Sequence, residues 1–307
     1  MPDSSNNIKN RTLTLLLSPQ WEDYELVDSG NGQKLERYGP YEFIRPEPQA
    51  MWKPALKEKR WQSAHAVFQP SREESGGHWI FKQPIEPNWV MRYAQLRFQV
   101  QTTAGRHLGV FPEQAAHWDW IGDPIRASKR QIQVLNLFGY TGLASLSAAQ
   151  AGARVTHVDA SKKALQWARQ NQEMSDLSDR PIRWILDDAM KFVQREARRD
   201  AQYDGIILDP PKFGRGPKGE IWEFFELFPR LLEACRAVLS PNPIFVVITA
   251  YAIRASSLSL HFSLQQAMDG LRGTISSGEL ALQEKSSGRL IPTAIFTRWS
   301  STGQPSS

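Results

Sequence analysis

Short motifs that could do chemistry follow several apolar runs in the second half of the sequence. They are LNLFGYTG at 135–142, VTHVDAS at 155–161, ILDDA at 185–189 and LDPPKFG at 208–214. Each places an amide or carboxylate side chain at the end of a predicted strand. Because the carboxyl ends of parallel strands meet at one edge of a sheet, the pattern predicts a single ligand-binding edge.

The first motif is typical of a turn between a strand and a helix. Gly139 and Gly142 bracket Tyr140 and Thr141 just before a stretch of small residues. Glycines let a backbone approach a ligand closely, and a helix N-terminus presents free amides to an anionic group. The dinucleotide fingerprint GxGxxG is absent, so a ligand with a carboxylate and an amine fits better than a pyrophosphate. A tight turn that binds nothing is the alternative.

Acidic residues at the next two strand ends match the polar groups of a nucleoside. Asp159 follows the second strand, and its carboxylate can accept hydrogen bonds from both hydroxyls of a ribose. Asp188 follows the third strand and can accept from an adenine amino group. A structural alternative exists at both positions, because Asp159 with Ser161, and Asp188 alone, precede predicted helices and suit an N-cap.

The fourth motif, Asp209-Pro210-Pro211-Lys212-Phe213, is the most specific of the four. Two prolines fix the backbone direction and leave carbonyl groups without competing local donors. The Asp209 carboxylate and a proline carbonyl can accept from a substrate amine, and Phe213 can stack on a base. The motif therefore predicts a catalytic group of Asp209, Pro210 and Phe213, with a rigid turn as the alternative.

In order and spacing, LNLFGYTG, HVDASKKAL, ILDDAMKF and LDPPKFGRG resemble the motifs of class I S-adenosylmethionine-dependent methyltransferases. More narrowly, they resemble the group that modifies large-subunit ribosomal RNA and carries a small β-rich module before the catalytic fold. The resemblance implies S-adenosyl-L-methionine as cofactor. The residues implied in cofactor binding are Phe111, Gln114, Asn136, Phe138, Gly139, Tyr140, Thr141, Gly142, Asp159, Ala160, Asp188, Ala189 and Asp209.

The resemblance also implies which part of the cofactor each group contacts. Asn136, Gly139 and Gly142 would line the methionine part, Asp159 the ribose and Asp188 the adenine.

Two further segments gain a role from the resemblance. Asp209 and its prolines would face the substrate beside the methyl group. The stretch GVFPEQ, with Phe111 and Gln114, resembles the family segment that covers the cofactor, although Ala115 stands where an arginine commonly follows the glutamine.

The single cysteine bears on the kind of methyl transfer. Relatives that methylate carbon 5 of cytosine need a thiolate that adds to the ring. After the fifth predicted strand, where those relatives keep the nucleophile, this sequence reads ITAYAIRAS with Ala250 and Tyr251. Cys235 lies instead in a predicted helix, where we expect a buried free thiol. We therefore expect direct transfer to a nitrogen or an oxygen, with Asp209 orienting an amine and receiving its proton.

The elements that must position these motifs alternate along the second half of the chain. Strands are predicted at 134–138, 154–159, 182–186, 205–208 and 244–249, with helices at 143–151, 162–174, 189–198 and 224–239 and a closing hairpin at 280–284 and 295–299. This alternation predicts an α/β fold with a doubly wound, mostly parallel seven-stranded sheet and an antiparallel C-terminal hairpin.

The first half is rich in Trp, Pro and Gly and predicts a small β-rich domain. Hairpins are predicted around a turn at 28–32 and around Ala104-Gly105, the second pairing 92–102 with 107–111. The basic stretch at 46–60 favours a solvated linker over a nucleic-acid contact. The predicted divisions are a polar tail at 1–20, a β-rich module at 21–115, a Rossmann-like methyltransferase domain at 116–300 and a polar tail at 301–307.

Composition narrows the class of protein. The 307 residues are 41% hydrophobic and 22% charged, enough for a large core, and 37 Lys and Arg against 32 Asp and Glu make an anionic partner plausible. One cysteine allows no intramolecular disulfide, and the polar start MPDSSNNIKN does not resemble a secretory signal or a membrane span. We therefore expect a cytoplasmic protein. The six histidines show no metal spacing, so we predict no metal.

The predicted function is methyl transfer, with ribosomal RNA as the favoured substrate mainly because of the resemblance. Two alternatives stay open. One is a methyltransferase of a protein amide or a small molecule, because a strand-end DPP motif suits planar amines generally. The other is a non-catalytic RNA-binding or ribosome-assembly factor that retains the cofactor pocket. A nicotinamide oxidoreductase is disfavoured by the missing phosphate-binding turn.

Overall fold

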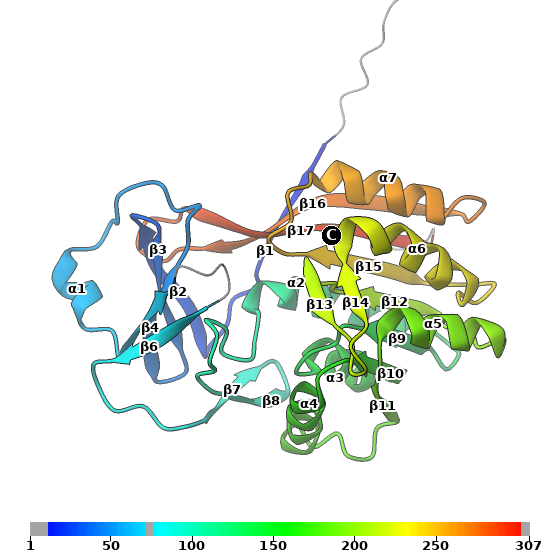
Figure 1. Cartoon of the computed structure of the whole chain (residues 1–307), viewed down its shortest axis with the longest axis horizontal. Coiled ribbons are helices and arrows are strands. Elements are labelled where there is room, and N and C mark those ends of the chain that lie inside the picture. The colour runs from blue at the N-terminus through cyan, green and yellow to red at the C-terminus, as the bar shows by residue number, and fades with distance from the viewer. Residues whose placement is uncertain (1–11, 72–75, 302–307) are drawn as a thin grey trace, which may run out of the picture.

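The computed structural model describes residues 12–71 and 76–301. A β-rich module lies beside a larger α/β unit (Figure 1). The hairpin of β16 (Gly273–Gln283) and β17 (Leu290–Ser301) extends from the larger unit toward the module (Figure 1). Within the described residues, no helix is long and apolar enough to cross a lipid bilayer.

The larger unit is built on an eight-stranded sheet with the order β1-β16-β17-β15-β12-β9-β10-β11. Neighbours among the last five strands pair in parallel, and β17 runs antiparallel to both β15 and β16. The doubly wound sheet and its C-terminal hairpin are confirmed. The parallel strands are β9 (Gln133–Leu137), β10 (Arg154–Asp159), β11 (Ile182–Leu186), β12 (Gly205–Leu208) and β15 (Phe245–Ala250).

The eighth strand was not foreseen. It is β1 (Thr14–Leu17), which pairs in parallel with β16 at the edge of the sheet, inside the segment that the sequence assigned to a polar tail. Its residues alternate between half-buried and exposed. One face of this short apolar run therefore packs on the sheet edge, which explains why it is ordered despite its polar surroundings.

Helices cover both faces of the sheet. Successive side chains of a strand point to opposite faces of the sheet. Val134 therefore packs in the core on one face and Leu135 in the core on the other, and each face is covered by its own set of helices. The first set is α2 (Ala115–Ala127) and α3 (Leu143–Gln150), with α4 (Lys162–Met174) beside α3. The second set is α5 (Ala189–Arg198), α6 (Phe224–Ala237) and α7 (Ser257–Ala267).

The module contains a five-stranded sheet in the order β2-β3-β4-β5-β6. The first predicted hairpin is confirmed, because Asn31 (φ 53°) and Gly32 (φ 74°) form the turn between β2 and β3, as an Asn-Gly pair favours. The elements are β2 (Tyr24–Gly30), β3 (Gln33–Tyr38), β4 (Tyr41–Pro46), α1 (Glu58–Gln62), β5 (Ala66–Pro70) and β6 (Gly77–Phe81).

The second predicted hairpin is wrong in its pairing. The observed hairpin joins β7 (Trp89–Tyr93) to β8 (Leu96–Val100) through a turn at Ala94, which has φ 49°. Buried side chains alternate with more exposed ones along both strands, so the paired strands bury the same face of the hairpin. The segment 101–111 is therefore free to run as a loop toward the edge of the central sheet.

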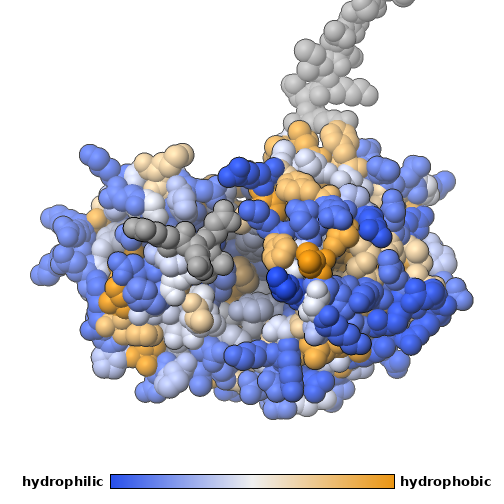
Figure 2. Space-filling view, in the orientation of Figure 1, coloured by the Kyte–Doolittle hydropathy of each residue, from blue (hydrophilic) through white to orange (hydrophobic). Residues whose placement is uncertain are grey.

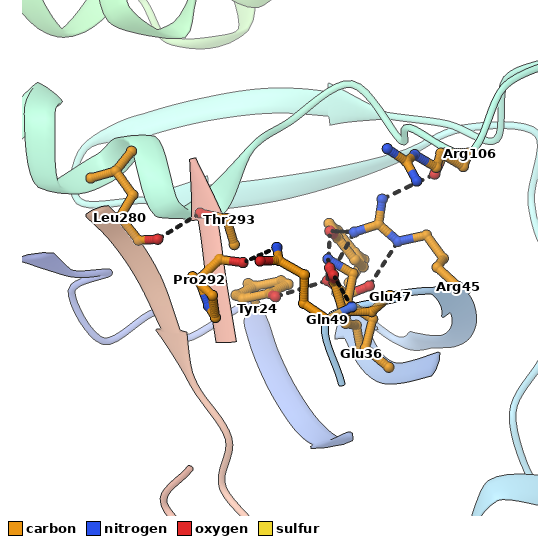
Figure 3. A network of polar contacts seen from close by, with 11 residues as sticks. Tyr24, Glu36, Arg45, Glu47, Gln49, Arg106, Leu280, Pro292 and Thr293 are labelled. Carbon is orange, nitrogen blue, oxygen red and sulfur yellow. Dashed lines mark hydrogen bonds and ion pairs between the residues drawn. The ribbon is translucent and has the colours of Figure 1, made fainter. Parts of the chain in front are cut away.

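A buried polar network stabilises the module and connects it to that loop (Figure 3). Arg45 donates from Nε to one oxygen of Glu36 at 2.7 Å and from an Nη to the other at 2.8 Å. The Tyr24 hydroxyl donates to Glu36 at 2.9 Å, and a second Nη of Arg45 donates to the Arg106 carbonyl at 3.0 Å. The network therefore holds the start of the loop against β3 and β4.

Candidate active site

The centre of the sheet is a topological switch point. From the neighbouring strands β9 and β12, the order continues to β10 and β11 on one side and to β15 on the other. Ligands of such sheets bind at the carboxyl edge beside the switch. Non-glycine residues with left-handed backbone gather there, namely Phe138 (φ 59°), Tyr140 (φ 51°) and Ala252 (φ 52°). Such conformations cost about 1–3 kcal/mol each and tend to cluster at functional sites.

The glycine loop after β9 is tightly constrained. Gly142 has φ 86°, and a Cβ there would lie 2.9 Å from the Cβ of Ala168. A Cβ on Gly139 would lie 2.3 Å from the ring of His157. Gly142 is the N-cap of α3, and no side chain caps this helix. The backbone amides of its first turn are therefore available to a carboxylate, which fits the amino-acid end of S-adenosylmethionine.

Asp159 links the second strand end to the glycine loop. Its Oδ2 accepts a hydrogen bond from the Tyr140 backbone N–H at 2.8 Å, and its Oδ1 accepts from the Ser161 N–H at 2.7 Å. Burial raises the pKa of this carboxyl, and the two backbone donors oppose the rise. Each carboxylate oxygen keeps a second lone pair, so the side chain can hold the loop and still accept from ribose hydroxyls.

Asn136 and Thr141 support the glycine loop from within the protein. Asn136 donates from Nδ2 to Ser145 Oγ at 2.9 Å, and Ser145 Oγ lies 3.0 Å from Nδ1 of His157. Thr141 donates from Oγ1 to the Gly109 carbonyl at 2.7 Å. Both side chains are buried. The hydrogen bonds of Asn136 and Thr141 are made within the protein. They hold in place the glycine loop, which is expected to line the methionine part of the cofactor.

Asp188, the residue implied for adenine, follows β11, and further residues implied in cofactor binding follow β9, β10 and β11. Asp188 is the N-cap of α5, and its Oδ1 accepts from the Lys191 N–H at 2.9 Å, so the capping alternative is present in the structure. Ala189 is buried at the start of the same helix, and Ala160 is half-buried. The ring of Phe138 packs 5.0 Å from that of Trp222.

Asp209 occupies the end of β12 beside the glycine loop. Its Oδ2 accepts a hydrogen bond from Gln114 Nε2 at 3.1 Å. Burial, and next the nearby charge of Glu113, raise the pKa of Asp209 to about 8. Pro210 is buried directly after it. A carboxyl whose pKa is raised by burial at a ligand-binding edge is a candidate functional group.

The module supplies one wall of the site through Phe111 and the short helix η1 (Pro112–Gln114). The Phe111 ring lies 5.9 Å from the Tyr140 ring on one side and 5.1 Å from the Tyr251 ring on the other. It therefore spans the gap between the loop after β9 and the loop after β15. The structure thus brings together Phe111, Gln114, Tyr140, Asp159 and Asp209.

Two residues at this edge were given no role by the sequence reasoning. Glu113 is buried and lies between the two residues of GVFPEQ that were selected. Tyr251 was recognised only as standing where cysteine-using relatives keep a nucleophile. The available signals were a glutamate next to the apolar residues of GVFPEQ, and a tyrosine directly after a strand that is buried along its whole length.

An apolar rim borders the hollow between the module and the larger unit (Figure 2). The rim lies on the hairpin of β13 (Phe213–Arg215) and β14 (Ile221–Glu223) and on the start of α6. Its exposed side chains are Phe213 at 55%, Ile221 at 61% and Phe225 at 53%. Exposed aromatic rings next to a binding edge are suited to stacking on a planar substrate.

The cysteine lies away from this edge. Cys235 is 3% exposed within α6, in the core between that helix and the sheet, and burial raises its pKa to about 12. A thiol in this environment stays protonated and is a poor nucleophile. Among the described residues, no three His, Cys, Asp or Glu side chains are grouped so as to hold a metal ion.

Comparison with known proteins agrees with this geometry. The family described as S-adenosylmethionine-dependent methyltransferase matches residues 54–256, which is more than half of the chain. The chain belongs to this family. It is an S-adenosylmethionine-dependent methyltransferase, and the cofactor expected from the sequence is confirmed at the level of the family.

Solved structures extend the match to the module. The methyltransferase of Agrobacterium tumefaciens is 47% identical, with a TM-score of 0.90 over 94% of both chains. SMU.776, solved in complex with SAH, is 20% identical, with a TM-score of 0.67 over 87% of this chain and 71% of that one, and shares the fold. The first of these matches both the module and the larger unit.

The curated relatives are named ribosomal RNA large subunit methyltransferases. The K/L protein of Shewanella sp. (strain ANA-3) is 33% identical over 151 residues, covering 48% of this chain and 20% of the relative. The I protein of Salmonella arizonae is 29% identical over 191 residues, covering 58% of this chain and 43% of the relative. The chain therefore spans less than half the length of either relative.

Proposed function

We propose that this methyltransferase acts on large-subunit ribosomal RNA and transfers the methyl group directly to a nitrogen or an oxygen, without a cysteine nucleophile. The observation that carries the direct mechanism is the pairing of Gln114 with Asp209 at a strand end that has no thiol. The names of the relatives and the excess of basic residues, 37 against 32, support RNA as the substrate.

S-adenosyl-L-methionine, when bound, supplies an electrophilic methyl group on a cationic sulfur. In the proposed arrangement its amino-acid end lies against Gly139, Gly142 and the first-turn amides of α3, and its ribose lies at Asp159. The adenine lies beside Asp188 and Ala189, with Phe111 and Gln114 covering the ligand. Two observations support this assignment. The Asp159 carboxylate oxygens keep lone pairs that can accept further hydrogen bonds, and no side chain caps the start of α3.

Three residues are proposed to act on the substrate. Asp209 and the carbonyl of Pro210 accept hydrogen bonds from the target amine and orient its lone pair toward the methyl group. Gln114 fixes the Asp209 carboxyl through the 3.1 Å hydrogen bond. Phe213, which is largely exposed at the apolar rim, stacks on the target base. A cationic sulfur nearby favours the ionised form of Asp209 and so strengthens it as an acceptor.

The division of the chain is part of the proposal. Residues 21–115 would act as a module that covers the site, and residues 116–300 as the catalytic domain. The placement of Phe111 and η1 over the sheet edge supports this division. We also propose a cytoplasmic location, because ribosomal RNA is the substrate and the one cysteine is a free thiol.

Transfer of a tritiated methyl group from S-adenosylmethionine tests the function. The acceptors are ribosomal RNA, protein extract and small molecules, each taken from a strain that lacks the gene. We expect label in large-subunit ribosomal RNA, and label in protein alone would contradict the proposal.

Variants of Asp209 and Cys235 test the mechanism in the same assay. We expect Asp209→Ala to abolish transfer while S-adenosylhomocysteine still raises the melting temperature. Cys235→Ala should keep turnover. A folded Cys235→Ala protein without activity would restore the cysteine mechanism.

A further inference from the structure

Tyr251 stands next to the proposed catalytic carboxyl at the carboxyl edge of the sheet. The strands β12 and β15 pair in parallel, with Leu208 opposite Ile248. Asp209 and Pro210 leave β12 just as Thr249 and Ala250 end β15, so Tyr251 follows at the same level. Ala252, with φ 52°, then turns the chain away. The backbone therefore presents the tyrosine at the place where the substrate is expected.

The hydroxyl of Tyr251 is buried and has no hydrogen bond of good geometry to any described residue. It faces Glu113 and Gln114, the two residues of η1 that lie beside Asp209. The hydrogen of this hydroxyl is directed at Glu113. The phenol oxygen also has a lone pair that can accept from a substrate.

Packing holds the phenol in this orientation. The Phe111 ring lies 5.1 Å from it, and it also packs against the apolar cluster of Leu280, Ala294 and Phe296. The ring cannot swing out without losing these contacts. Its hydroxyl is therefore a fixed group at the site.

Glu113 is the charged group behind this hydroxyl. Burial raises its pKa, whereas the charge of Lys34 and the Tyr251 hydroxyl oppose the rise, and Glu36 adds to it. Its own charge contributes to the raised pKa of Asp209. Two neighbouring carboxyls do not ionise independently. Of the two, Glu113 is the one with a facing cation, so it is better able to carry negative charge and to take up a proton.

We propose that Tyr251 and Glu113 form a proton outlet for methyl transfer to an exocyclic amine of an RNA base, an inference that rests on the proposed function. The amine nitrogen forms the new bond to the methyl carbon, and the carbon–sulfur bond breaks with its electron pair left on sulfur. The proton released from nitrogen passes to Tyr251 Oη, and the phenolic hydrogen moves to a Glu113 oxygen. Asp209 orients the amine in this scheme, and Glu113 holds the proton until solvent removes it.

Tyr251→Phe and Glu113→Gln test the outlet in the full-length protein. The probe is tritiated S-adenosylmethionine with whichever of the three acceptor pools the wild type labels. We expect both variants to lower kcat about 100-fold, the scale of general acid–base catalysis. The KM for the acceptor and the affinity for S-adenosylhomocysteine, measured by calorimetry, should change less than about threefold. In Glu113→Gln the acid limb of the pH–rate profile should also move to lower pH, because the charge of Glu113 no longer raises the pKa of Asp209.

A matched buried pair serves as the control. The Tyr203 hydroxyl donates to the buried Glu196 at 2.7 Å, at the edge of the second helix layer. Tyr203→Phe removes a hydroxyl of the same kind and should leave kcat unchanged.

The outcomes separate the outlet from the proposed substrate. Wild-type kcat in Tyr251→Phe, or a loss of kcat that follows a loss of cofactor affinity, would overturn the outlet while the substrate proposal stands. Label in a pool other than ribosomal RNA would overturn the substrate and still measure the outlet. An absence of label in every pool would overturn both.

Discussion

Gln114 donates a hydrogen bond to Asp209 over 3.1 Å, and this contact joins the last residues of the module to the substrate side of the central sheet. Without the amide, Asp209 loses the donor that fixes its orientation. We expect Gln114→Ala to lower kcat/KM for methyl transfer about tenfold, the effect of losing about one hydrogen bond to a charged group. Gln150→Ala, which removes a surface amide bonded to Gln95, is the control and should be neutral.

The raised pKa of Asp209 predicts a pH dependence of stability. Its pKa is about 8 in the folded protein against an ordinary value of 3.8. The folded state therefore binds more protons between these values, and its stability falls as pH rises from about 4 through 8. Asp209→Asn removes this loss. We expect its melting temperature to exceed that of the wild type at pH 9 by more than at pH 5, and an equal difference at both pH values would contradict the raised pKa.

Many helices and strands of the larger unit can be predicted from local sequence, because hydrophobic periodicity and capping residues mark their bounds. The helix at Lys162–Met174 matches its prediction residue for residue, with Ser161 as the N-cap whose Oγ accepts from the Ala164 N–H. The strand at Arg154–Asp159 matches as well. Both are bounded by capping or acidic residues that act within a few positions of the chain.

The features that escaped prediction depend on contacts between distant segments. Leu15 and Leu17 lie in a short apolar run whose partner, β16, is more than 250 residues away. The segment 96–100 was predicted as part of a strand, but local pattern alone cannot choose between pairing partners on its two sides. Glu113 and Tyr251 become a pair only when Phe111 brings the module over the sheet edge. Burial of a glutamate is a tertiary property that its neighbours in sequence do not reveal.

The buried ion pair of the module should be essential for its stability. Arg45 and Glu36 form two hydrogen bonds of 2.7 and 2.8 Å, and the pKa of Glu36 falls to about 2 even though burial opposes the fall. Removing Arg45 leaves the buried Glu36 carboxylate with Lys34, at 3.6 Å, in place of a partner that forms two hydrogen bonds. Breaking a buried ion pair by removing one partner costs about 3–5 kcal/mol. We expect Arg45→Met to lower the free energy of unfolding in urea by that amount.

An exposed ion pair provides the control for Arg45→Met. Arg126 and Asp123 lie on the surface at 2.7 Å, where such pairs contribute about 0–1 kcal/mol. Arg126→Met should therefore change the free energy of unfolding by less than about 1 kcal/mol. Equal effects of the two variants would show that the Arg45 pair is exposed to solvent in solution.

Two glycines, Gly142 in the glycine loop and Gly152 after α3, both have positive φ but differ in surroundings. Gly142 has φ 86° and Gly152 has φ 108°, so alanine strains the backbone at either position by about 1 kcal/mol. A Cβ on Gly152 meets nothing within 4 Å, whereas one on Gly142 would lie 2.9 Å from the Ala168 Cβ and 3.1 Å from the Trp184 ring. Relieving that overlap requires α3 to shift away from α4.

We therefore expect Gly142→Ala to lower the free energy of unfolding about 2 kcal/mol more than Gly152→Ala does, since overpacking adds to the backbone strain. The shift would also displace the first-turn amides of α3 that are proposed to receive the carboxylate of the cofactor. Calorimetry should show at least a tenfold loss of S-adenosylhomocysteine affinity in Gly142→Ala and none in Gly152→Ala. Unchanged affinity in a destabilised Gly142→Ala protein would separate the packing role of this glycine from cofactor binding, and would place the amino-acid end of the cofactor elsewhere on the edge.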